Sequence, residues 1–100
     1  MMAEPYPHDY RDPSVGITFH LPSRRYFVPN AWLLHAALNR QGTRIEIHYT
    51  HCLVTIEGRN LGNLHEQIGK FGVSWIREMR MDKPDEPTVA LIEISEKTDD

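Results

Sequence analysis

The chain has 100 residues, with 11 Lys and Arg, 14 Asp and Glu, and a single cysteine. This length fits one domain with a modest core, and one cysteine excludes an internal disulfide framework. No apolar run approaches the roughly 20 residues that cross a bilayer. The first residues lack the apolar stretch of a secretory signal, so we expect a cytoplasmic protein with no membrane partner.

The charged residues are unevenly distributed. Residues 16–81 contain eight Lys and Arg against four Glu, whereas the two ends together contain three against ten Asp and Glu. A mildly basic centre favours an anionic partner, although acidic ends that keep the protein soluble explain the same distribution. We expect residues 1–15 to be disordered because they combine proline with charge, residues 16–95 to form one domain, and residues 96–100 to form an acidic tail.

Two short strands are predicted after the N-terminal segment. Residues 17–21 alternate apolar and polar side chains, and residues 25–28 resume that pattern after a break at Pro22. A hairpin is the simplest interpretation. Residues 31–39 follow, rich in Leu and Ala and without Val or Ile, which favours a helix with Asn30 as its N-cap. This helix would be apolar nearly all round and therefore buried on several sides.

The most regular pattern lies in residues 43–61, around which the rest of the chain is expected to pack. Apolar side chains occupy every second position of residues 45–49 and again of residues 52–56, which predicts two adjacent strands joined by a tight link. Asn63 and Glu66 resemble a capping box. Leu64, Ile68 and Phe71 then form one apolar stripe, so a second helix is predicted from Asn63 to about Gly72.

The last elements complete the predicted fold. Residues 73–79 are interpreted as a strand, with a continued helix as the alternative, and residues 88–95 as a final strand. The predicted fold class is α+β, in the order β-β-α-β-β-α-β-β. We expect a small, mostly antiparallel sheet with two helices on one face, or a half-open barrel with helical caps.

No motif in the sequence indicates catalysis, a metal or a cofactor. His48, His51 and Cys52 have the chemistry of metal ligands, but alternation along a strand places His48 and His51 on opposite faces. His35 stands alone on an apolar segment, as buried histidines often do. There is neither a G-x-S-x-G nucleophile elbow nor a glycine-rich phosphate loop. We therefore expect no enzyme activity, no catalytic residue, no metal and no cofactor.

Two functional hypotheses remain. The supply of apolar surface favours a protein-interaction or assembly module, as a homodimer, a small ring or a complex with another protein. Its expected interface residues are Trp32, Leu34, Trp75 and Leu91. The alternative is a domain that binds single-stranded RNA or DNA, because basic residues lie among aromatic ones. Its expected contacts are Arg24, Arg25, Arg44 and Arg59, and the sequence leaves open whether they share a face.

Overall fold

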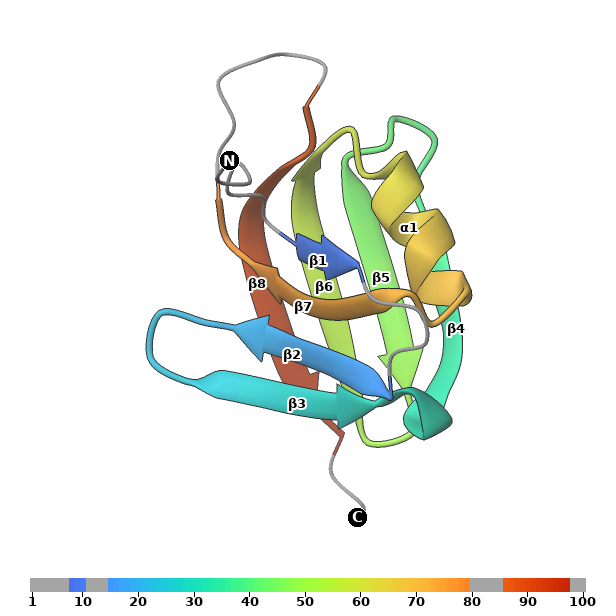
Figure 1. Cartoon of the computed structure of the whole chain (residues 1–100), viewed down its shortest axis with the longest axis vertical. Coiled ribbons are helices and arrows are strands. Elements are labelled where there is room, and N and C mark those ends of the chain that lie inside the picture. Colours follow the sequence, from blue (N-terminus) through green and yellow to red (C-terminus); the bar gives the residue numbers. More distant parts are fainter. Residues whose placement is uncertain (1–7, 11–14, 80–85, 98–100) are drawn as a thin grey trace.

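The computed structural model describes residues 8–10, 15–79 and 86–97. They form two four-stranded sheets that pack face to face, with one short helix at the side of the pair (Figure 1). The strands of one sheet cross those of the other at a steep angle (Figure 1), as in orthogonally packed sheets. No helix in the described residues is long and apolar enough to cross a membrane.

The first sheet has the strand order β1-β7-β2-β3. Its strands are β1 (His8–Tyr10), β2 (Gly16–His20), β3 (Arg25–Pro29) and β7 (Val73–Arg77). β2 and β3 form an antiparallel hairpin, β1 pairs antiparallel with β7, and β7 runs parallel to β2. The parallel pair brings together two segments that are far apart in the sequence.

The second sheet has the order β4-β5-β6-β8 and is antiparallel throughout. Its strands are β4 (Leu33–Leu38), β5 (Arg44–Tyr49), β6 (Cys52–Arg59) and β8 (Thr88–Glu96). A 3-10 turn, η1 (Asn30–Trp32), leads into β4 from the first sheet. The helix α1 (Gly62–Gly69) packs against β4 and β7.

The core lies between the two sheets. It takes Ile17, Phe19 and Val28 from the first sheet, and Ile47 and Val54 are among the residues that the second sheet contributes; all are at most 2% exposed. Because side chains alternate between the faces of a strand, the residues between these core positions have to point away from the core. The burial of the core side chains therefore determines which residues lie on the outer face of each sheet.

Several predicted elements are confirmed. The hairpin of residues 17–28, the paired strands of the central stretch, and strands at residues 73–77 and 88–96 are all present. The helix over residues 64–68 is also present, and Leu64 and Ile68 are buried as predicted. The helix alternative for residues 73–79 is excluded by the strand β7.

The predicted helix over residues 31–39 is wrong. This segment is the 3-10 turn followed by strand β4, so the described residues contain one α-helix and two separate sheets where two helices and one sheet or barrel were expected. In β4 the side chains of Ala36 and Leu38 pack against the core, while His35 and Ala37 are exposed. The uniform Leu and Ala composition conceals this alternation. Pairing with β5 outweighs helix preferences worth only tenths of a kcal/mol per residue.

Two smaller expectations also differ from the structure. α1 begins at Gly62 after Leu61, and no side chain caps it, so Asn63 is not its N-cap. Residues 8–10, inside the segment expected to be disordered, form β1. The rest of that expectation, for residues 1–7 and 11–14, and the expectation for residues 98–100 of the acidic tail lie outside the described residues.

Gly58 tests the contact between β6 and β8. A side chain there would overlap the carbonyl oxygen of Thr88, at the point where the ladder changes register. We expect Gly58→Ala to lower the free energy of unfolding by about 3 kcal/mol, because neither backbone can yield easily. Urea denaturation measures this. Gly69→Ala is the matched control, since nothing lies within 4 Å of the added carbon, and it should cost nothing; equal losses would contradict the account.

Tyr49 tests the core itself. Its side chain is 1% exposed, and its hydroxyl has no hydrogen-bond partner within the described part of the chain. Burial, followed by the charge of Cys52, raises the pKa of Tyr49. Since an unpaired buried hydroxyl is costly, Tyr49→Phe should raise the free energy of unfolding by about 1 kcal/mol.

The pH dependence of Tyr49 has a definite sign. The folded state holds the phenol proton more tightly than the unfolded state. The free energy of unfolding therefore falls as the pH rises above the ordinary tyrosine pKa of 10.0. The Tyr49→Phe variant should therefore lose less stability than the parent protein in thermal melts above pH 10.0. If Tyr49→Phe were less stable than the parent protein at neutral pH, the Tyr49 hydroxyl would have a hydrogen-bond partner, which would contradict this account.

Candidate functional site

The outer face of the first sheet gathers cationic and aromatic side chains. On β2 and β7 the buried residues Phe19 and Ile76 point into the core, so their neighbours on each strand face outward. The register of the three strands then fixes which outward residues are adjacent. These residues are Thr18, His20, Arg25, Phe27, Trp75 and Arg77, and we refer to them as the cationic–aromatic face.

The face consists of two rows that run across the strands. In one row Arg25 of β3 lies opposite His20 of β2, which in turn lies beside Arg77 of β7. In the next row Phe27 lies opposite Thr18, which lies beside Trp75. A row of positive or protonatable groups therefore runs directly alongside a row that has an aromatic ring at each end.

Trp75 contacts two other side chains of this face. The His20 ring stacks on the Trp75 ring, with centroids 5.4 Å apart and an interplanar angle of 27°. The guanidinium carbon of Arg77 lies 5.2 Å from the centroid of the same ring, within the range of a cation–π contact. These contacts order the side chains before any ligand arrives, which lowers the entropy cost of binding.

Two positive charges lie close to the histidine of this face. Burial and then the positive charges of Arg25 and Arg77 lower the pKa of His20. Within the described residues neither arginine forms an ion pair with a carboxylate. A terminal nitrogen of Arg77 donates to the sulfur of Met79 at 3.5 Å, whereas its buried Nε has no partner in the part of the chain that the structure describes. Most of the donor capacity of both guanidinium groups is therefore unused.

Phe27 is the most accessible ring of the face. Its side chain is 51% exposed, and it lies across Gly16, where a larger residue would collide with it. Trp75 is half-buried beneath its two neighbours. The exposed ring at one end and the ordered stack at the other provide flat surfaces on which a planar group can stack.

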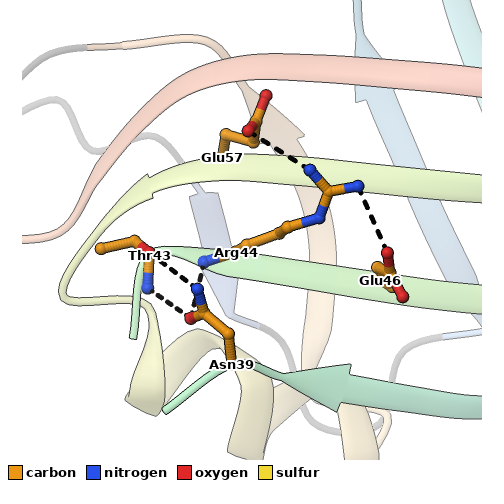
Figure 2. A network of polar contacts seen from close by, with 5 residues as sticks. All are labelled: Asn39, Thr43, Arg44, Glu46 and Glu57. Atoms are coloured by element: carbon orange, nitrogen blue, oxygen red, sulfur yellow. Dashed lines mark hydrogen bonds and ion pairs between the residues drawn. The ribbon is translucent and has the colours of Figure 1, made fainter. Parts of the chain in front are cut away.

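The outer face of the second sheet is different because its arginine is paired with carboxylates. Arg44 donates to Glu57 at 3.4 Å and to Glu46 at 3.2 Å, and Asn39 bonds the Thr43 side chain and the backbone of the turn (Figure 2). An open hollow of about 210 Å³ lies beside this network. Its only arginine is already paired twice, so the hollow offers little to an anion.

The structure separates the four arginines expected to contact nucleic acid. Arg25 lies on the cationic–aromatic face, while Arg24 lies over the Tyr26 ring, 5.0 Å from its centroid, on the side of β3 that faces the core. Arg44 lies on the outer face of the second sheet, and Arg59 ends β6 opposite Thr88. Of these four arginines only Arg25 therefore belongs to the cationic–aromatic face. The second arginine of that face, Arg77, was not among the predicted contacts.

The four apolar residues expected at an interface also lie apart. Trp32 is half-buried and its ring lies 4.3 Å from that of His51, and Trp75 belongs to the first sheet. Leu34 is 58% exposed on β4 and Leu91 is 37% exposed on β8, at opposite edges of the second sheet. They form no common patch, and their role in an interface stays a prediction.

The histidines and the cysteine do not form a metal site. His48 stacks on His35 at 4.2 Å between centroids on the outer face of the second sheet, His51 lies in the exposed turn, and Cys52 is buried in the core. Among residues 8–10, 15–79 and 86–97, no group of three or more potential ligands is placed to hold a metal ion. Burial raises the pKa of Cys52, which makes its thiol a poor nucleophile.

Comparisons of the chain with protein-family models, with curated proteins and with solved structures found no match.

The protonation of His20 tests the electrostatics of this face. We expect His20 to titrate below 6.5, the ordinary value, in an NMR titration of its ring protons. Replacing Arg25 with Ala should raise this pKa, because one of the two nearby positive charges is removed. Arg40→Ala is the matched control, since Arg40 is exposed in the turn after β4. An unchanged His20 pKa in Arg25→Ala would contradict the proposed row of charges.

Proposed function

We propose that this protein is a non-enzymatic module that binds single-stranded nucleic acid on its cationic–aromatic face. The observation that carries the proposal is the pair of arginines, Arg25 and Arg77, which lack carboxylate partners among the described residues and lie beside Phe27 and Trp75. Proteins that bind single strands combine these two elements, positive charge for the backbone and aromatic rings for the bases.

Each row of the face has a distinct part in this binding. Phosphate oxygens accept hydrogen bonds from the guanidinium groups of Arg25 and Arg77. His20 lies between them and gains a proton more readily once a phosphate offsets the two positive charges. Bases stack on the exposed Phe27 ring and against the edge of the Trp75 stack.

The spacing of the aromatic row favours single strands over a duplex. β2 separates β3 from β7 in the sheet, and two strand spacings amount to about 10 Å. Successive bases in a duplex are only about 3.4 Å apart. Two bases on these rings therefore belong to an unstacked, extended strand, as in the recognition of single-stranded loops and ends.

The chain as a whole is not strongly basic, with a formal net charge of −3. Affinity must therefore come from the local arrangement of few cations, and it should be modest and depend strongly on salt.

A protein-assembly role, the first hypothesis from the sequence, is here the second candidate. Its specific support is the exposed Leu34 on an edge strand and the exposed Leu91. These side chains lie on separate strands, so neither provides the contiguous apolar patch that marks a strong protein interface.

Fluorescence anisotropy with labelled 12-nucleotide oligouridylate and oligothymidylate tests the nucleic-acid proposal. Phe27→Ala should weaken binding by about tenfold, because loss of one stacked base costs ~1–3 kcal/mol. Arg25→Ala should weaken binding and lower the slope of log affinity against log salt by about 0.7. Binding by the parent protein should strengthen as the pH falls through 6.5, since the bound phosphate favours protonated His20.

Arg40→Ala is the control for charge, because it makes the same change in net charge outside the face. It should leave both affinity and salt dependence close to those of the parent protein. Two outcomes would refute the proposal: no binding at about 50 mM salt, where electrostatic attraction is strong, or equal losses in Arg25→Ala and Arg40→Ala.

A further inference from the structure

β3 has an unpaired edge that is complementary to a second copy of itself. Its other side pairs with β2. The hydrogen bonds Leu21 N–Arg24 O, at 2.8 Å, and Asn30 N–Val15 O, at 3.0 Å, fix the phase of this hairpin. Because bonded pairs alternate in an antiparallel ladder, the backbone groups of Tyr26 and Val28 point toward β2.

The backbone groups of Arg25 and Phe27 consequently point to the open side. They find no backbone partner within the described residues. Pro29, which has no N–H to donate, occupies the next outward position, and this is where an edge strand tolerates proline. The edge thus presents two adjacent N–H groups and their carbonyls, and the ladder stops at Pro29.

Two other strand edges in the described structure, those of β4 and β8, are partly occupied. The imidazole of His65 on α1 lies 3.0 Å from the carbonyl of Ala36, over the outer edge of β4. On β8, Met79 pairs with Val89, and the carboxylate of Glu78 accepts from the backbone of Ile92 at 2.9 Å. Edges are commonly protected by such covering groups, and within the part of the chain that the structure describes no backbone hydrogen bond covers this edge of β3 along residues 25–27.

From this difference we propose that two copies pair antiparallel through β3 about a two-fold axis at Tyr26. In this register Arg25 of each copy lies opposite the partner's Phe27, and all four outward N–H groups find carbonyl acceptors. A register shifted by one residue, centred on Phe27, would place the carbonyl of Arg25 against the ring of the partner's Pro29, which cannot donate. The backbone therefore favours the axis at Tyr26.

The side chains favour the same register. On the outer face each exposed Arg25 meets the exposed phenyl ring of the partner's Phe27, a cation–π arrangement. The two first sheets then join into one continuous eight-stranded sheet, with both cationic–aromatic faces on the same surface. The pairing itself does not depend on the proposed binding of nucleic acid.

The interface is short, so the dimer should be weak and concentration-dependent. Sedimentation velocity from about 20 µM to about 1 mM protein, without nucleic acid, should show a monomer–dimer equilibrium. Phe27→Ala and Phe27→Pro both remove the ring, but only proline also removes the outward N–H. We expect Phe27→Ala to retain weakened dimerisation and Phe27→Pro to remain monomeric at every concentration.

Amide hydrogen exchange in the unmodified chain provides a readout that does not depend on the folding of a variant. The amides of Tyr26 and Val28 should be protected at all concentrations, because they bond to β2. The amides of Arg25 and Phe27 should gain protection only as the protein concentration rises. Unprotected Arg25 and Phe27 amides at about 1 mM, or a dimer that persists in Phe27→Pro, would overturn the proposal.

Discussion

The packing of two sheets against one shared core is the constraint on which the rest of the molecule depends. Phe19 of β2 and Ile76 of β7 are fully buried between the sheets. Once they point inward, alternation leaves no choice for His20 and Arg77, which must lie side by side on the opposite surface. A surface of charged and aromatic residues is thus a direct consequence of core formation, and its geometry follows that of the strands that carry it.

The two outer surfaces differ in what happens to their charges. On the second sheet Arg44 lies between Glu46 and Glu57 and is paired with both carboxylates, so this cluster keeps a net negative charge (Figure 2). On the first sheet Arg25 and Arg77 flank a histidine whose pKa they lower. Unrelieved repulsion of this kind weakens a folded protein unless a ligand offsets it, and perturbed titratable groups therefore point to binding sites.

The sequence predicted strands where apolar and polar residues alternate and failed where they do not. Both strands of the central stretch were found from their period of two, whereas β4 was taken for a helix because Leu and Ala fill both of its faces. Only the pairing of β4 with β5, a tertiary interaction, decides between the two structures. The same limit affected α1, whose start after Leu61 is set by the chain's path and not by a capping side chain.

The site could be predicted in part. Hairpin pairing alone would place Arg25 beside His20, and one hypothesis from the sequence was that basic and aromatic residues act together. Arg77 and Trp75 could not be added, because their place depends on the parallel pairing of β7 with β2, which no local pattern specifies. Arg24 was misplaced for the opposite reason: its neighbour in sequence, Arg25, shares its charge but points to the other side of β3.

The most direct test of this account is to map amide and indole shifts by NMR as an unlabelled oligouridylate is added to isotope-labelled protein. If the cationic–aromatic face is the binding site, the perturbed signals will cluster at His20, Arg25, Phe27, Arg77 and the indole of Trp75. Residues of the opposite surface, such as Glu46 and Leu91, will keep their shifts. Perturbations centred on that opposite surface, or none at saturating ligand, would contradict the account.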